Sequence, residues 1–186
     1  KNEYIYLGHY YGKTLPIIDS VMLDENSQGV FKGPKKLGGG IYLIGFPDRS
    51  RNFEMLIDKN QNFSVIADTN DLETIQFVNS PENLQFREYQ RYMNTNGRAM
   101  DSLLKLRSGA SEADSVKLTK QLEELNAKIK KYRTDIIEND PNSLLATLMK
   151  AMKEPEIPYD APEAKTDSLF AYRYFKSHYW DGVYFF

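Results

Sequence analysis

The chain has no cysteine among its 186 residues. This absence excludes a disulfide framework, a thiolate metal site, a cysteine nucleophile and a Cys-x-x-Cys redox pair within these residues. Histidine occurs only at His9 and His178, without the spacing of a zinc-binding helix. We therefore predict no catalytic residue, no metal site and no cofactor, and expect the chain itself not to be an enzyme. A cryptic hydrolase is the enzymatic alternative, but no Gly-x-Ser-x-Gly motif supports it.

Charge of one sign is not in excess, and long apolar runs are missing. Lysine and arginine total 24 against 26 acidic residues, so the net charge is −2. Such a balance predicts no nucleic-acid partner. No run approaches the roughly 18 apolar residues of a membrane span. The chain opens in a strand-like run without a secretion signal and closes on Tyr184-Phe185-Phe186, so we expect it to be a segment of a longer protein.

Two short segments resemble ligand-binding loops but lack essential positions. Gly12-Lys13-Thr14 ends like a phosphate loop, yet Leu15-Pro16 leads into a predicted strand instead of a helix. Residues 58–62 begin like a calcium loop, but Phe63 and Thr69 replace the required glycine and glutamate. Both segments are predicted to be turns.

Residues 1–79 are predicted to form an antiparallel β-sheet or sandwich. Short runs rich in β-branched and aromatic residues alternate with turn formers, without intervening helices. In the second of these runs, strict alternation places Ile17 on the same face as Asp19 and Val21. The predicted strands are residues 4–7, 17–23, 30–31, 41–46, 53–57, 63–67 and 75–78.

Residues 80–186 are predicted to form a helical domain, which makes the whole chain an α+β protein. Ser80 is a suitable N-cap, and residues 108–110 are predicted to end the first helix. Ser111 and Asp114 resemble a capping pair for a second helix, which carries an apolar stripe from Leu118 to Ile136. These two helices are predicted to pair as an antiparallel hairpin. The stripe could instead continue into a second copy, which would make the protein a homodimer.

The last third of the chain is predicted to hold two shorter helices around a proline-rich linker. Asp140-Pro141 is expected to cap the third helix, and residues 155–163 read as the linker. A fourth helix is predicted from about Thr166. Its aromatic residues are explained best by core packing. If these aromatic residues are exposed instead, they would form a glycan platform or protein-docking surface. The candidate residues are Tyr174, Tyr179, Trp180 and Tyr184.

The order of these segments resembles two domain families that occur together. Residues 4–7, 18–21, 29–33, 40–43, 53–58 and 62–65 resemble the domain of unknown function 4369. Residues 80–89, 144–155, 167–170 and 178–181 are similar to its usual helical companion, the domain of unknown function 5106. Together these segments extend over nearly the whole chain.

The resemblance implies a place in the bacterial cell envelope. In such proteins a signal or lipid anchor precedes the β domain, and a thioredoxin-like domain with a Cys-x-x-Cys motif follows the helices. It supplies no catalytic residue, because the redox cysteines would lie beyond Phe186. We therefore expect a periplasmic or envelope protein. Its only membrane contact would be a possible N-terminal lipid anchor that is missing from this sequence. The chain would be the non-catalytic accessory region of a thiol-disulfide oxidoreductase that positions or recognises envelope partners. The alternatives are a glycan- or peptide-binding module and a dimerisation module.

Overall fold

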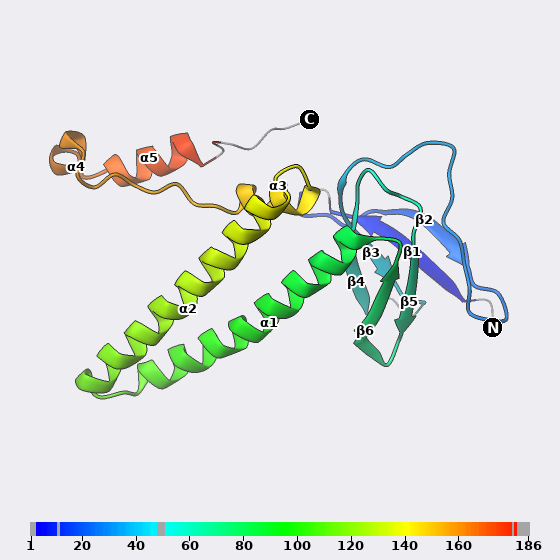
Figure 1. Cartoon of the computed structure of the whole chain (residues 1–186), viewed down its shortest axis with the longest axis horizontal. Coiled ribbons are helices and arrows are strands. Elements are labelled where there is room, and N and C mark those ends of the chain that lie inside the picture. Colours follow the sequence, from blue (N-terminus) through cyan, green and yellow to red (C-terminus); the bar gives the residue numbers. More distant parts are fainter. Residues whose placement is uncertain (1–2, 11, 48–50, 180, 182–186) are drawn as a thin grey trace. The chain divides into compact units, whose positions relative to one another are not determined.

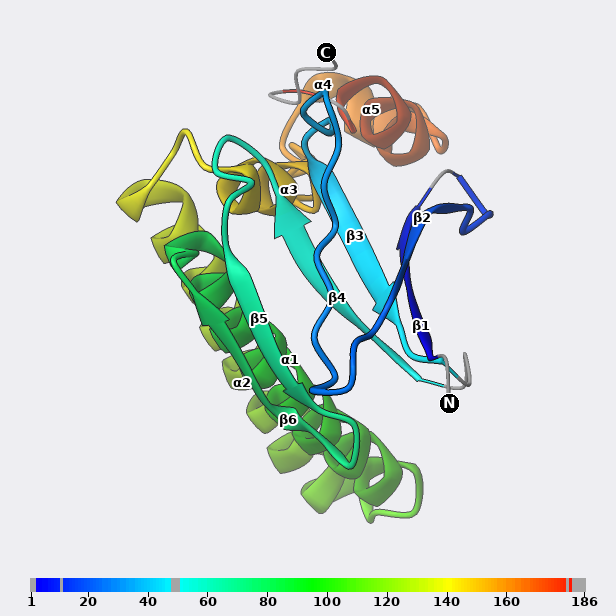
Figure 2. The ribbon, with the colours of Figure 1, turned by 90° about the vertical axis from the view of Figure 1, so that its right-hand side faces the viewer.

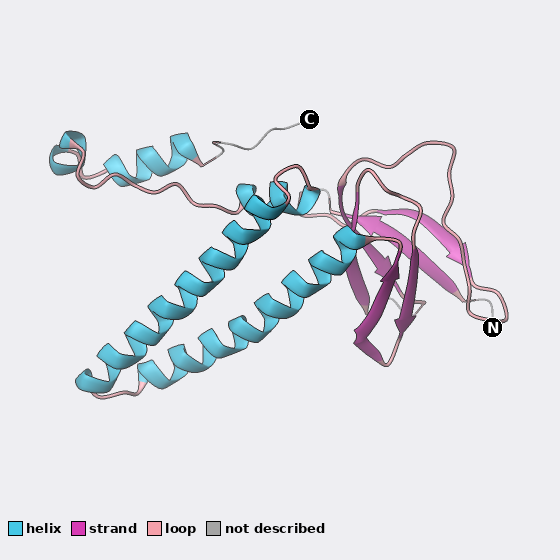
Figure 3. Ribbon diagram, in the orientation of Figure 1, coloured by secondary structure: helices cyan, strands magenta, loops and turns pink. Residues whose placement is uncertain are grey.

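In the described part of the chain, six strands precede five helices, so the chain has the predicted α+β fold (Figures 1 and 3). The computed structural model describes residues 3–10, 12–47, 51–179 and 181. The strands are β1 (Tyr4–His9), β2 (Ile17–Met22), β3 (Gly40–Gly45), β4 (Asn52–Ile57), β5 (Ser64–Asp68) and β6 (Asp71–Val78). The helices are α1 (Pro81–Ser108), α2 (Glu112–Asn139), α3 (Leu144–Ala151), α4 (Pro162–Thr166) and α5 (Phe170–His178).

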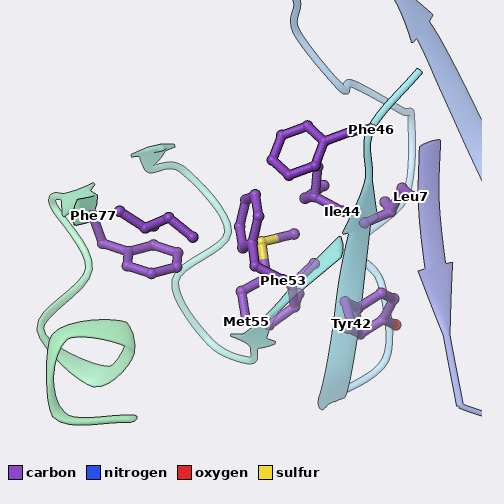
Figure 4. Packing of buried hydrophobic residues seen from close by; sticks show 9 residues of the cluster. Leu7, Tyr42, Ile44, Phe46, Phe53, Met55 and Phe77 are labelled. Atoms are coloured by element: carbon purple, nitrogen blue, oxygen red, sulfur yellow. The ribbon is translucent and has the colours of Figure 1, made fainter. Parts of the chain in front are cut away.

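The strands form two antiparallel sheets that share one core. One sheet has the order β2-β1-β3-β4, and β5 pairs with β6 in the other (Figure 2). Phe53 of β4 meets Phe77 of β6 edge to face, with ring centroids 6.4 Å apart. Figure 4 shows the aliphatic and aromatic side chains between the strands. Burial of these side chains is the main term that stabilises the β-sheets.

The segment around Val30 and Phe31 is not a strand, contrary to the sequence prediction. It belongs to a long connection between β2 and β3, and Phe31 packs against the core without pairing to a strand. A Cβ on Gly29 would lie 3.0 Å from Val21 Cγ1 and 3.1 Å from Leu23 Cδ2, so a larger residue would require these side chains to shift. Apolar content alone therefore does not specify the backbone conformation of this segment.

Helix α1 is anchored to the open edge of β4 by one buried asparagine. Asn83 Oδ1 accepts a hydrogen bond from Leu56 N at 2.7 Å, and Asn83 Nδ2 donates to Leu56 O at 2.8 Å. Nδ2 also donates to the hydroxyl of Ser80, which makes no capping bond to the helix backbone. The side-chain amide thus takes the place of a neighbouring strand and satisfies buried backbone groups of β4.

Two compact units divide between Gly109 and Ala110. The domain boundary predicted at residues 79–80 coincides with the change from strands to helices. Helix α1 nevertheless belongs to the first unit because it packs on β4 and β6. The predicted hairpin of the first two helices would join the two units and stays a prediction.

The second unit contains α2, α3, α4 and α5. Helix α2 begins at the predicted cap, where Ser111 Oγ accepts from Asp114 N. The cap of α3 is Ser143, not Asp140-Pro141, because the Ser143 hydroxyl accepts from Ala146 N at 3.0 Å. Residues 155–161 form the non-helical part of the predicted linker, and α4 occupies its end. The helix expected from Thr166 begins at Phe170.

Candidate functional site

Two of the four aromatic residues predicted as a binding surface, Tyr174 and Tyr179, belong to the described part of the chain. Tyr174 lies on α5 with its ring stacked on His178, at a centroid distance of 4.0 Å. Tyr179 follows the helix and contacts Phe175 at 5.2 Å. Both tyrosines are half-buried, whereas Trp180 and Tyr184 lie outside the described residues. Each tyrosine of the described pair thus contacts a neighbouring aromatic ring of the same segment, and the four-residue surface stays a prediction.

The other sequence motifs have local structural roles. Gly12 and Lys13 lie in the turn between β1 and β2. In the predicted turn at residues 58–62, Asn60 donates to Asn79 O, and Gln61 binds the backbone of Leu37 through both of its amide atoms. Among the residues that the structure describes, no group of three potential metal-binding side chains is found. None of the described helices combines the length and apolar character needed to span a lipid bilayer.

One carboxylate is held between the sheet and α1. Glu54 on β4 accepts hydrogen bonds from Tyr10 Oη at 3.1 Å and from Gln90 Nε2 at 3.0 Å. The bond to Glu54, with smaller effects of burial and of the Glu54 charge, raises the pKa of the Tyr10 phenol. Both carboxylate oxygens have a partner, so this arrangement joins the sheet to α1 and does not hold a free acid or base.

A surface of exposed apolar side chains lies at the β2 edge of the same sheet, across from the β4 edge that carries Glu54. Tyr4 and Met22 are a cross-strand pair, and Ile17 is paired with Gly8. Because Leu7 faces the core, these residues face the other side of the sheet. Leu15 packs beside Gly8, within 3.7 Å of where its Cβ would be. We call Tyr4, Leu15, Ile17 and Met22 the edge patch; their exposed fractions are 42, 45, 50 and 48%.

The edge patch depends on a register shift that the sequence did not predict. The shift between Leu7 and Gly8 leaves Ile18 without a partner and places Ile17 on the face of Met22. Strict alternation had placed Ile17 with Asp19 and Val21. The prediction for Ile17 is therefore wrong, and a bulge explains the difference. The only feature of the sequence that points to the edge patch is the mainly apolar run from Leu15 to Ile18, and this run does not specify which face of the sheet its side chains occupy.

The edge patch adjoins a sheet edge without a neighbouring strand in the described part of the chain. Strand β2 is the outermost strand and pairs only with β1. On the same face, Leu43 and Leu56 near the other edge are 4 and 1% exposed, so the face is covered at one end and open at the other. An exposed apolar face beside an outermost strand can bind an extended polypeptide.

No protein-family model, curated protein or solved structure matches this chain. The resemblance to the domains of unknown function 4369 and 5106 therefore stays a prediction.

Proposed function

We propose that this chain is a non-catalytic accessory region that recognises protein partners through the edge patch. The observation that carries the proposal is the coincidence of exposed apolar side chains with the free edge of β2. The family resemblance adds a context: the periplasm or cell envelope, and a thioredoxin-like thiol-disulfide oxidoreductase as the complete protein. In that context the chain would bring a partner close to a downstream redox domain.

The edge of β2 is suited to recognition of an extended segment. Backbone groups of an edge strand supply affinity without sequence preference, and alternate side chains of the added strand meet the flanking face. Ile17 and Met22 would then select partners with apolar residues at every second position. Natural proteins usually protect an open strand with charge or proline. Strand β2 has no proline and one charged residue, Asp19, whose carboxylate accepts a hydrogen bond from Ser20 N at 2.7 Å, so its edge is only partly protected.

The two alternative functions rest on other parts of the molecule. A glycan- or peptide-binding module would use the aromatic residues of α5, of which Tyr174 and Tyr179 are described. A homodimer would use the apolar stripe of α2. Three residues of that stripe, Leu122, Ile129 and Ile136, are already buried in one chain. The dimer stays a prediction, which light scattering tests by the dependence of the molecular mass on protein concentration.

Site-specific photo-crosslinking tests the proposed recognition surface. We would place a benzophenone amino acid at Met22 and produce the full-length protein in its native host. A discrete adduct is expected, and Ile17→Lys should lower its yield at least about fivefold because a charge replaces an apolar contact. Leu106 on α1 is 62% exposed and provides the control, both as a crosslinking position and as Leu106→Lys. Equal adducts from Met22 and Leu106, or none from Met22, would contradict the proposal.

The redox context has a separate test. We expect the native coding sequence beyond Phe186 to continue into a thioredoxin-like segment with a Cys-x-x-Cys motif. A stop codon soon after Phe186 would overturn that context and leave the edge patch as a recognition surface of another kind of protein.

A further inference from the structure

A groove in the second unit is independent of the edge patch. It lies between α2, the C-terminal end of α3 and the extended segment that follows α3, and its volume is about 440 Å³. The apolar lining residues are Ile129 and Ile137 from α2, together with Met149, Met152 and Pro155.

An exposed ion pair lies at the outer wall of the groove. Lys130 Nζ on α2 lies 2.5 Å from Glu156 Oε1 in the extended segment. The hydrogen bond to Lys130 lowers the pKa of Glu156, as do the charges of Lys130 and Lys153. Glu156 is therefore ionised at neutral pH and is neutralised by Lys130. The pair spans the groove wall, and Arg133 takes part in no ion pair of the described residues.

Arg133 lines the groove without a partner in the described part of the chain. Its Nε is buried and has no hydrogen-bond acceptor there, and no ion pair of the described residues includes its guanidinium. A buried donor without an acceptor is costly, and such a group calls for an explanation. Nε is enclosed by protein atoms, so a groove ligand would meet Arg133 through its Nη groups, which can bind a carboxylate by two parallel hydrogen bonds.

The charges of the groove favour a ligand with one negative group. Arg133, Lys130 and Lys153 contribute three positive charges, against two carboxylates at Glu154 and Glu156, so the net charge of the lining is +1. Lys130 and Glu156 already compensate each other, and Glu154 is exposed. With Glu154 counted, a single carboxylate would bring the net charge of the whole lining from +1 to zero.

We propose that this groove binds a small amphiphilic carboxylate. Its carboxylate pairs with Arg133, supported by Lys153, and its aliphatic chain lies along Ile129 and the two methionines. Methionine suits such a ligand because its flexible, polarisable side chain adapts to chains of different length. The apolar part supplies most of the favourable free energy, and the carboxylate fixes the orientation.

Methionine-methyl NMR of the whole 186-residue chain tests the proposal with decanoate as the probe. Saturable shifts are expected at Met149 and Met152, while Met22 and Met55 of the first unit stay unchanged. Decanol should bind at least tenfold more weakly, because it has the apolar chain without the charge. Acetate, which has the charge without the chain, should produce no saturable shift.

The variants separate the role of Arg133 from a general effect of charge. Arg133→Gln should weaken decanoate binding at least tenfold, and Lys153→Gln about threefold. Lys128→Gln is the matched control: it removes one exposed cation of α2 outside the groove and should leave affinity unchanged. Thermal unfolding verifies that each variant is folded. If Arg133→Gln does not fold, the affinity of Lys153→Gln is compared with that of Lys128→Gln instead. Absence of saturable shifts with decanoate, equal affinity for decanol, or equal affinity in the folded charge variants and Lys128→Gln would overturn the proposal.

Discussion

At the scale of single residues, Asn83 has the largest structural consequence in the first unit. Its amide bonds to both backbone groups of Leu56, and its side chain is almost completely buried. A buried amide that bonds to the backbone of the outermost strand couples the position of the helix directly to that of the sheet. No pattern of hydrophobicity marks this residue, because asparagine is ordinarily a surface or turn residue.

We predict that Asn83→Ala lowers the free energy of unfolding by about 2–4 kcal/mol, because two buried backbone groups lose their partners. Chemical denaturation of the first unit, followed by circular dichroism, measures this loss. Asn94→Ala is the matched control on the same helix, where the side chain is exposed, and should cost less than about 0.5 kcal/mol. Similar stabilities of the two variants would show that the amide bridge does not anchor α1.

At the scale of elements, helix caps of the same chemistry differ in their surroundings. Ser111 caps a helix of 28 residues at an exposed position. Ser143 caps a helix of eight residues, is buried, and also donates from its hydroxyl to Asp140 O at 2.9 Å. Water can replace the first cap more readily than the second, because only the first is exposed to solvent.

We predict that Ser143→Ala destabilises α3 by about 1–2 kcal/mol, whereas Ser111→Ala costs about 0.5 kcal/mol. Amide hydrogen exchange of Leu148 and Met149 reports on α3 directly and should accelerate in the first variant alone. The reverse order, or equal acceleration in both variants, would mean that burial does not govern the contribution of these caps.

At the scale of the whole molecule, the β-sheets and α1 form one compact unit. The buried residues of α1 are Asn83, Phe86 and Tyr89, all within its first three turns. Buried aromatic side chains of this size cover on the order of 150–250 Å² each, which is worth several kcal/mol for the two. That is a large share of the roughly 5–15 kcal/mol that stabilises a typical domain.

We therefore predict different behaviour for three fragments of the first unit. Residues 1–109 and 1–95 should unfold cooperatively and give dispersed amide spectra, because both retain the buried part of α1. Residues 1–79, which end at the boundary predicted from the sequence, should lack a cooperative transition. A cooperative transition of 1–79 equal to that of 1–109 would show that α1 is not needed to complete the sheet unit.

Much of the element order could be predicted from residue types. The period-two runs gave β1, β2, β3 and β4 within a few residues, and Ser111 marked the start of α2 correctly. The failures have physical causes. Ser143 competes with Asp140-Pro141 as a cap, and only the hydrogen bond to Ala146 distinguishes them. The segment at Phe31 has strand-like composition, but packing over Gly29 and Val21 decided its course.

The candidate sites were less predictable than the fold. The sequence drew attention to the aromatic residues of α5, whereas the edge patch arose from a bulge in β1–β2 pairing. Arg133 lies off the apolar stripe of α2, so the hydrophobic periodicity of the helix indicates an ordinary solvated residue at this position. Its buried Nε and the groove depend on the position of α3 and of the segment after it.

The sequence by itself determined the α+β class, the division into strands and helices, and the absence of thiol chemistry from these residues. Those properties depend on local periodicity and on which atoms are present. Tertiary structure alone decided that Ile17 faces outward, that Asn83 closes the edge of β4, and that Arg133 lines a groove. Each of these depends on contacts between segments far apart in the chain or on pairing register, which local periodicity does not encode.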